Sequence, residues 1–357
     1  MKVIKIDKKN WADGIEKSRS SYRLFGPVKV ENKNFGEFKE LAAGQMPDMT
    51  ATDSHLSPKA LCFPPSEVIM EYTTDETSTN YNLMKVPEKD YSPRAVIGIR
   101  PYDAASYLIA KKNFDTPEYR DPYWCDAYEA TTFIGLAVNE PSDFDFSTST
   151  KSGPFDESGL DVLMVDVGDS YLAKVITDKG DAYLKAAGWE TEAGGDAEKQ
   201  IESLKKKAEE AIESTVSFDR IREKSIMELH AADFWEDVSF ACLNCGTCTY
   251  VCPTCWCFDI QDETRGKSGV RLKVWDSCMY PLFTLHTTGH NPRNTKVQRV
   301  RQRFMHKLKY YLDKYEDGIM CVGCGRCIRS CPVNIDIRKV CQLMNELESD
   351  TVACTVQ

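Results

Sequence analysis

The stretch Cys242–Cys257 reads Cys-Leu-Asn-Cys-Gly-Thr-Cys-Thr-Tyr-Val-Cys-Pro-Thr-Cys-Trp-Cys, and its first four cysteines and the proline follow C-x2-C-x2-C-x3-C-P. The same pattern returns over residues 321–332. This spacing is typical of bacterial iron–sulfur ligand runs, in which the fourth cysteine of each run binds the other run's cluster. C-x2-C pairs also build zinc sites, but two complete runs ending in Cys-Pro favour two [4Fe-4S] clusters over zinc.

Crossed ligation gives each cluster three cysteines from one run and one from the other. Small residues such as Gly246 and Gly325 let backbone amides approach the sulfurs, and the proline after the fourth cysteine sends the chain away from the turn. The first cluster is therefore predicted on Cys242, Cys245, Cys248 and Cys331, and the second on Cys321, Cys324, Cys327 and Cys252.

Length and composition indicate a globular protein of two or three domains. The 357 residues are 42% hydrophobic and 28% charged. No apolar run approaches the roughly 20 residues that span a bilayer, and residues 1–7 lack the apolar region of a signal peptide. We therefore expect a cytoplasmic protein without a membrane span, in which fifteen cysteines serve metal rather than disulfides. The net charge of −10 disfavours a nucleic-acid partner.

Residues 1–190 are predicted to form a mixed α/β docking domain. A β-rich run covers 94–100, and 131–138 reads as a second buried strand. Between them Asp103 can cap a helix over 104–112, in which Leu108 and Ile109 are expected to face inward. Together these segments predict a β-α-β unit.

Further strands are expected over 160–165 and 171–176, joined by a turn at 168–169. No glycine-rich phosphate loop follows any strand, so we expect neither a flavin nor a nicotinamide site in this chain.

The remaining chain is predicted to be helical. Residues 191–240 form a connector, and 241–357 form an α-helical ferredoxin domain with both clusters, because the 253–320 segment between the runs is too long for a compact ferredoxin. The fold class is thus α+β. Helices are expected over 196–212, 220–229, 234–240, 296–311 and 336–347.

Seven cysteines lie outside the ligand runs. Cys255, Cys257 and Cys278 could hold a third cluster, or exchange with Cys252 as ligand, although three thiolates need a fourth donor that the sequence does not show. Three others suit the role of small buried hydrophobes. These are Cys62, Cys341 and Cys354.

Positive charge concentrates between the two runs. It belongs either to a solvated helix face or to side chains that offset the negative clusters and raise their potentials. His290, in the loop 289–293, reads as a structural histidine rather than a metal ligand. The basic residues in question are Arg293, Arg299, Arg301, Arg303 and Lys307.

The sequence resembles the iron–sulfur β subunit of cytoplasmic NiFe sulfhydrogenases and the related A subunit of anaerobic sulfite reductase. The resemblance covers most of the chain. The motifs that carry it are Cys252-Pro-Thr-Cys-Trp-Cys-Phe258, Trp275-Asp-Ser-Cys278, Gly289-His-Asn-Pro-Arg293, Arg301-Gln-Arg303, His306-Lys307, Cys321-Val-Gly-Cys-Gly-Arg-Cys327, Gly98-Ile-Arg-Pro-Tyr-Asp103, Asp121-Pro-Tyr123 and Asp166-Val-Gly-Asp-Ser-Tyr-Leu172.

Two positions depart from this family. Many members have cysteine where this chain has Tyr102, and a Cys-Phe-Cys element where it reads Phe144-Asp-Phe-Ser147. Cys125 is then left without obvious partners, and any extra metal site of the family's N-terminal domain is expected to be absent.

The resemblance implies an electron-transfer subunit that is not catalytic alone. Its partners would be a flavin-binding reductase subunit and a hydrogenase, sulfite reductase or heterodisulfide-reductase-like subunit. The alternative is a catalytic subunit that reduces a sulfur compound at an additional cluster on Cys255, Cys257 and Cys278, although no Cys-Cys-Gly motif is present. A zinc-stabilised interaction protein is the third interpretation.

Overall fold

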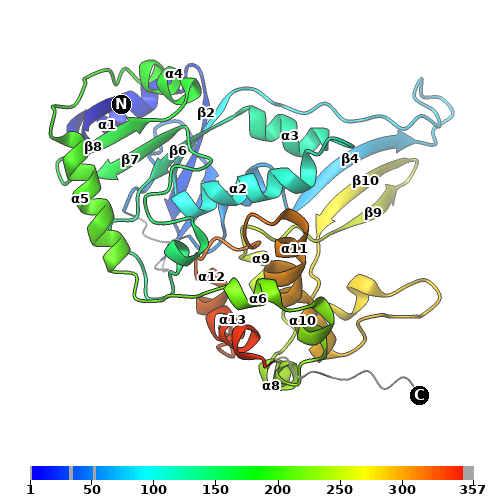
Figure 1. Cartoon of the computed structure of the whole chain (residues 1–357). Coiled ribbons are helices and arrows are strands. Elements are labelled where there is room, and N and C mark those ends of the chain that lie inside the picture. The colour runs from blue at the N-terminus through cyan, green and yellow to red at the C-terminus, as the bar shows by residue number, and fades with distance from the viewer. Residues whose placement is uncertain (1, 32–34, 51–53, 349–357) are drawn as a thin grey trace.

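The computed structural model describes residues 2–31, 35–50 and 54–348. A seven-stranded mixed sheet occupies the N-terminal half, with the order β1-β8-β7-β6-β5-β2-β3 (Figure 1). Strands β2, β5, β6 and β7 run parallel, and the other three are antiparallel to their neighbours. The strands are β1 (Val3–Asp7), β2 (Arg23–Lys29), β3 (Gly36–Glu40), β5 (Arg94–Ile99), β6 (Thr131–Leu136), β7 (Val162–Asp166) and β8 (Ser170–Val175).

Helices cover both faces of this sheet, as a parallel sheet with fully buried strands requires. One core packs α2, α3 and α5 against the sheet, and a second core packs α1 and α4 against its other face. The helices are α1 (Trp11–Ser18), α2 (Pro101–Phe114), α3 (Pro122–Glu129), α4 (Asp178–Ala186) and α5 (Ala197–Glu210).

The predicted β-α-β unit is confirmed, because β5 and β6 pair in parallel and α2 lies between them in the chain. Two details were wrong. Helix α2 begins at Pro101 with Arg100 at its N-cap, so Asp103 lies inside the first turn and does not cap the helix. Leu108, expected to face inward, is 37% exposed.

A second sheet, which the sequence did not predict, joins the two halves of the chain. Its order is β4-β10-β9, with β4 (Ser66–Thr73), β9 (Phe258–Arg265) and β10 (Ser268–Trp275) all antiparallel. This sheet projects from the rest of the molecule in Figure 1. Every residue of β9 is exposed, so the strand has no alternation of buried and exposed residues that would have revealed it.

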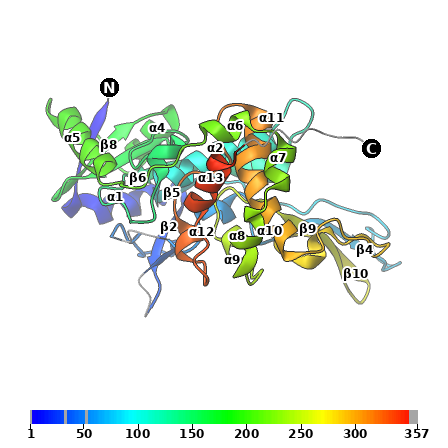
Figure 2. The same cartoon turned by 60° about the horizontal axis from the view of Figure 1, so that its bottom comes forward.

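Apart from β9 and β10, the described chain after α5 consists of short helices joined by loops, and it lies beside the N-terminal sheet (Figure 2). The expected helix 220–229 was wrong as a single element. Ser225 accepts a hydrogen bond from Glu228 N–H in a capping box and starts a new helix there. The helices are α6 (Asp219–Glu223), α7 (Ile226–Ala231), α8 (Phe234–Phe240), α9 (Thr247–Tyr250), α10 (Lys296–Met305), α11 (Tyr311–Tyr315), α12 (Arg326–Arg329) and α13 (Ile337–Glu346).

The predicted helix 296–311 extends further than expected. Thr295 caps α10 in a capping box with Gln298, and a π-helical stretch, His306–Tyr310, joins α10 to α11. Asp336 caps α13 by accepting from Arg338 N–H, as predicted. Short 3-10 turns complete the fold at η1 (Lys8–Asn10), η2 (Pro58–Leu61), η3 (Ser147–Thr150) and η4 (Pro281–Thr284).

In the described part of the chain, no helix has both the length and the apolar character needed to cross a bilayer.

Candidate metal centre

The two ligand runs fold into loops of the same shape. Asn244 and Gly323 occupy equivalent positions with φ of 53° and 68°, and Gly246 and Gly325 follow with φ of 75° and 68°. This left-handed backbone is reached easily only by glycine and, less easily, by asparagine. Each loop then starts a single helical turn, α9 or α12.

Four of the predicted ligands surround one cavity. Its lining includes Met279, Val300 and Phe304 together with the four cysteines, and Cys327 reaches it from the second run. The cysteines are those predicted for the first cluster, Cys242, Cys245, Cys248 and Cys331.

The other four predicted ligands line a second, neighbouring cavity. Phe146, Thr254, Lys307 and Ile337 complete much of its wall. Cys327 therefore lies between the two cavities, and Cys252 comes from the first run, as crossed ligation requires. The cysteines of this cavity are Cys252, Cys321, Cys324 and Cys327.

The chemistry of the first cavity fits an iron–sulfur cluster. Backbone N–H groups point at the sulfurs, with Asn244 N–H donating to Cys242 Sγ at 3.4 Å and Ile335 N–H donating to Cys331 Sγ at 3.2 Å. Among the described residues, no three His, Cys, Asp or Glu side chains could share a single metal ion. Ligands of a cubane bind different irons, so they need not converge on one point.

A buried guanidinium in the first cavity also fits an anionic cluster. Arg303 is 5% exposed, and its Nε and Nη2 have no hydrogen-bond partner in the described chain. Such groups carry a desolvation cost unless an acceptor faces them. Burial lowers the pKa of Arg303, but the Cys248 and Cys327 sulfurs outweigh burial and raise it above its ordinary value. A cluster in this cavity would supply acceptor sulfurs.

Lys307 plays the corresponding part in the second cavity. It is 1% exposed, and its ammonium donates to Thr254 Oγ1 at 2.7 Å and to the Met320 carbonyl at 2.8 Å. Burial lowers the pKa of Lys307, but the opposing effect of the Cys252 and Cys255 sulfurs is larger. The pKa of Lys307 is therefore raised above its ordinary value. For Arg299, Arg303 and Lys307, all buried, a solvated helix face was the wrong interpretation. The charges of Arg303 and Lys307 lie against the cavities.

The N-terminal half is joined to the second ligand loop by a buried ion pair that was not predicted from the sequence. Arg326 lies between Cys324 and Cys327 and forms a bidentate pair with Asp103 of α2, at 2.5 and 2.6 Å. The two side chains are 1% and 0% exposed. Arg326 also donates to the Ser54 carbonyl and hydroxyl. The position of Arg326 inside the ligand run was the one feature of the sequence that could have indicated this ion pair, because a buried charge next to cluster ligands needs a partner.

The positions that depart from the resembled family cover the second ligand loop. Tyr102 is buried beside Val322 and Cys324, with the Arg326 guanidinium 5.6 Å from its ring centroid. The segment 144–147 lies directly on the loop, where Phe146 N–H donates to the Gly323 carbonyl at 2.9 Å. A Cβ added at Gly323 would come within 2.4 Å of Ser147 Cα.

Replacing Gly323 by alanine is expected to destabilise the protein by more than about 3 kcal/mol, since left-handed backbone strain and a backbone clash add together. Loss of the second cluster should accompany it. Gly266→Ala is the matched control, because Gly266 has φ of 61° with open space around it. That variant should lose only about 1–2 kcal/mol. Denaturant midpoints and iron content measured anaerobically for both variants test this, and equal losses would contradict it.

The three additional cysteines influence one another and Cys252 in two pairs. Hydrogen bonding from Cys255 is the largest cause that lowers the pKa of Cys252. Hydrogen bonding from Cys278 is the largest cause that lowers the pKa of Cys257, to about 7. Lys59, 3% exposed, donates to the carbonyls of Cys252 and Cys255 at 3.0 Å each. A third cluster on Cys255, Cys257 and Cys278 stays a prediction.

The other sequence-predicted residues lie elsewhere. Cys62, Cys125 and Cys341 are buried, with Cys341 packed in the helical core, and Cys354 falls outside the described residues. His290 is exposed, and its ring contacts that of His286.

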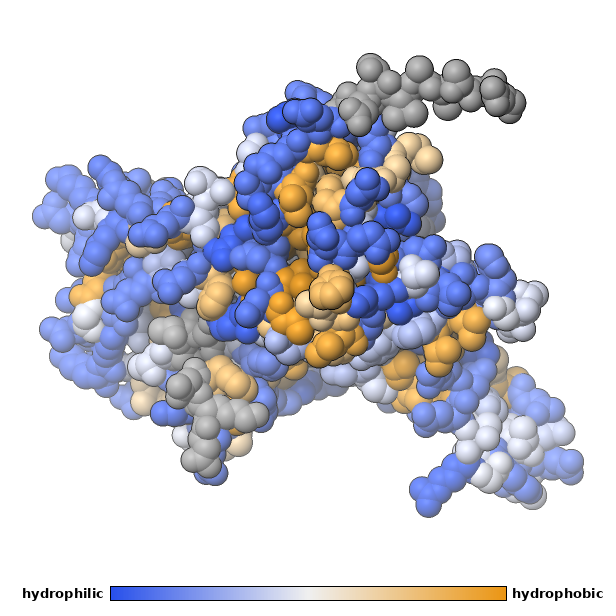
Figure 3. Space-filling view, turned by 90° about the horizontal axis from the view of Figure 1, so that it is seen from below, coloured by the Kyte–Doolittle hydropathy of each residue, from blue (hydrophilic) through white to orange (hydrophobic). Residues whose placement is uncertain are grey.

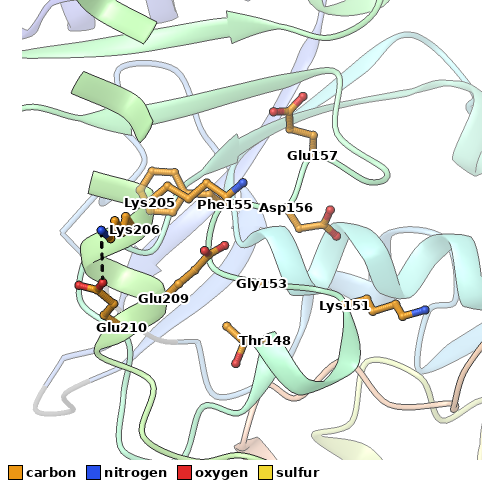
Figure 4. A pocket seen from close by; sticks show the side chains of 10 residues that line it. All are labelled: Thr148, Lys151, Gly153, Phe155, Asp156, Glu157, Lys205, Lys206, Glu209 and Glu210. Carbon is orange, nitrogen blue, oxygen red and sulfur yellow. Dashed lines mark ion pairs between the residues drawn. The ribbon is translucent and has the colours of Figure 1, made fainter. Parts of the chain in front are cut away.

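A surface hollow between α5 and the segment 148–157 has no predicted ligand in its lining (Figure 4). It carries both signs of charge, including an ion pair between Lys206 and Glu210.

Residues 241–335 match the family of 4Fe-4S dicluster domains. The chain is thus an iron–sulfur protein of the 4Fe-4S class. Over nearly its whole length it is similar to the β subunit of sulfhydrogenase 2 from Pyrococcus furiosus, at 27% identity over 355 residues, which cover 97% of this chain and 99% of that one. The resemblance predicted from the sequence motifs is confirmed, and the two comparisons support an iron–sulfur electron-transfer subunit.

Proposed function

We propose that the chain relays electrons through two [4Fe-4S] clusters between a flavin-binding reductase subunit and a catalytic subunit of a cytoplasmic complex. Cys242, Cys245, Cys248 and Cys331 hold one cluster, and Cys252, Cys321, Cys324 and Cys327 hold the other. When bound, such a cluster takes up or releases one electron. The protein supplies the thiolate ligands, the amide donors and the buried charges around them.

The observation that carries the proposal is that each cavity has a cysteine that can be approached from the surface, and the two approaches lie in different places. At the first cavity, Cys245 is exposed beside Phe240 and Leu243, which are 83% and 65% exposed. Figure 3 shows apolar side chains gathered on this side of the molecule. At the second cavity, a surface cleft between α2, the segment 216–222 and α11 reaches down to Cys321. A relay needs two such approaches, one for the donor and one for the acceptor.

The catalytic partner is a hydrogenase, a sulfite reductase or a heterodisulfide-reductase-like subunit. The similarity to a sulfhydrogenase β subunit supports the first of these. Within the described residues every cysteine is free, which supports a reducing compartment such as the cytoplasm. The N-terminal domain has a docking role in this proposal. Its contacts through Asp103 and the segment 144–147 add the further role of enclosing the second cluster.

Anaerobic isolation of the tagged chain from its native cell tests the relay. We expect a flavin-containing subunit and a metal-containing catalytic subunit to copurify. NAD(P)H should then bleach the iron–sulfur absorbance of the complex and leave that of the isolated chain unchanged. A Cys125→Ala variant, altered at a buried cysteine that lines neither cavity, should behave like the wild type. A free monomer that carries electrons between soluble proteins would contradict the proposal, and turnover of sulfite or a heterodisulfide by the chain alone would favour the catalytic alternative.

A further inference from the structure

Cys257 and Cys278 meet at the base of the β9–β10 hairpin. The strands pair up to Phe258 and Trp275, and Asp276 N–H then donates to the Cys257 carbonyl at 3.0 Å, which extends the ladder by one residue. Cys278 follows two residues further on, and hydrogen bonding from its side chain is the largest cause that lowers the pKa of Cys257, to about 7. The base of the hairpin therefore brings two free cysteines close together, although they are distant in the sequence.

The pair is attached firmly to the first ligand run. The Ser277 and Thr249 hydroxyls are 2.8 Å apart, and the Asn244 side-chain amide donates to the Met279 carbonyl at 3.2 Å. Both contacts flank Cys278, whose sulfur is close enough to Cys248 to feel its charge. Met279, the residue after Cys278, lines the first cavity. The thiol pair thus lies immediately beside the first predicted cluster site.

The pair is also distinct from the predicted ligands. Within the described chain, Cys257 and Cys278 line neither of the two cavities. Cys278 is 9% exposed and Cys257 is partly exposed. A disulfide needs sulfurs at about 2 Å and Cβ atoms at about 4 Å, and cysteines held at the same hydrogen-bonded hairpin base can reach this geometry with a small movement. Cys257 is thus the more accessible cysteine and Cys278 the buried one. This arrangement suits a dithiol that is oxidised to a disulfide and reduced again.

We propose that Cys257 and Cys278 form a redox-active pair that cycles between dithiol and disulfide and exchanges two electrons with the cluster pair. Closing the pair breaks two S–H bonds and forms one S–S bond. Two protons go to solvent, and two electrons pass, one to each of the two oxidised clusters. Opening the pair is the reverse and takes one electron from each reduced cluster. The pair would match one-electron carriers to a two-electron partner reaction.

This inference rests on the cluster pair of the proposed function, and thiol labelling tests it in the wild-type complex. The anaerobic complex is poised oxidised with ferricyanide or reduced with dithionite, alkylated with iodoacetamide and analysed by peptide mass spectrometry. We expect a peptide pair joined through Cys257 and Cys278 in the oxidised sample, and both cysteines alkylated in the reduced sample. In a reductive titration, Cys278→Ser should take up two fewer electrons per chain than wild type, and the control Cys125→Ser should not differ.

Equal alkylation of both cysteines in the two states would show inert thiols and overturn the inference. Protection in both states, together with more iron than two clusters need, would show a third cluster and overturn it equally. The labelling of the wild-type complex tests the proposed dithiol even if the Cys278→Ser variant fails to fold. Labelling does not depend on which subunits copurify, so failure of the dithiol and failure of the relay are distinguishable.

Discussion

Replacing Cys331 by serine is expected to remove the cluster held mainly by the first ligand run, although Cys331 belongs to the second. Its sulfur lines the same cavity as Cys242, Cys245 and Cys248, and it accepts the Ile335 N–H. A serine hydroxyl is a far weaker iron ligand than a thiolate, because soft sulfur suits iron–sulfur clusters. Iron and acid-labile sulfide should fall by about half, as one of two similar clusters is lost.

Two reference variants decide which cluster is lost. Cys245→Ser alters the first cavity alone, and Cys324→Ser alters the second alone. The electron paramagnetic resonance spectrum of reduced Cys331→Ser should match that of Cys245→Ser. Cys125→Ala, which alters a buried cysteine that lines neither cavity, should keep full iron content. If Cys331→Ser instead reproduced Cys324→Ser, the crossed ligation would be wrong.

Replacing Asp103 by leucine is expected to lower the free energy of unfolding by about 3–5 kcal/mol, the usual effect of removing one partner of a buried ion pair. The Arg326 guanidinium would stay buried between two predicted ligands, with Ser54 as its remaining acceptor. We expect the second ligand loop to shift as a result. Iron should be lost from the second cluster before the first. Anaerobic denaturant unfolding, followed by tryptophan fluorescence and iron release, measures both effects.

A double variant and an exposed pair provide the controls. Asp103→Leu with Arg326→Met leaves no unpaired charge, and replacing both partners by apolar groups is often close to neutral, so much of the stability should return. Lys199 and Asp196 form a pair that is 84% and 94% exposed, and Asp196→Ala should change stability by less than about 0.5 kcal/mol. If Asp103→Leu were as mild as Asp196→Ala, the buried pair would not support the loop.

The spacing of the cysteines was enough to predict both ligand sets that the structure gathers around two cavities. Ligand spacing is a local property, because the short segments between the three cysteines of a run keep these cysteines near one another whatever surrounds them. The same holds for helix starts with a capping residue, such as Asp336 before α13. The buried strands β5 and β6 were also readable from their continuous apolar residues.

Contacts between distant segments could not be predicted in this way. Asp103 has the same sequence signature whether it caps a helix or pairs with Arg326, and only the packing of α2 against the second loop decides between them. Strand β4 pairs with β10, which lies far along the chain, and no local sequence pattern predicts that pairing. The burial of Arg303 and Lys307 likewise depends on the elements packed over α10 and the π-helical stretch.

The sequence by itself therefore determined which cysteines are the predicted ligands and which class of cluster they are predicted to hold, since both predictions follow from the order of residues within short runs. Only the tertiary structure decided which charges and which part of the N-terminal domain enclose those cysteines. It also decided that the base of the β9–β10 hairpin brings Cys257 and Cys278 close together. The physical reason is that burial and pairing depend on the packing of the whole chain, whereas ligand spacing depends only on the chain's local geometry.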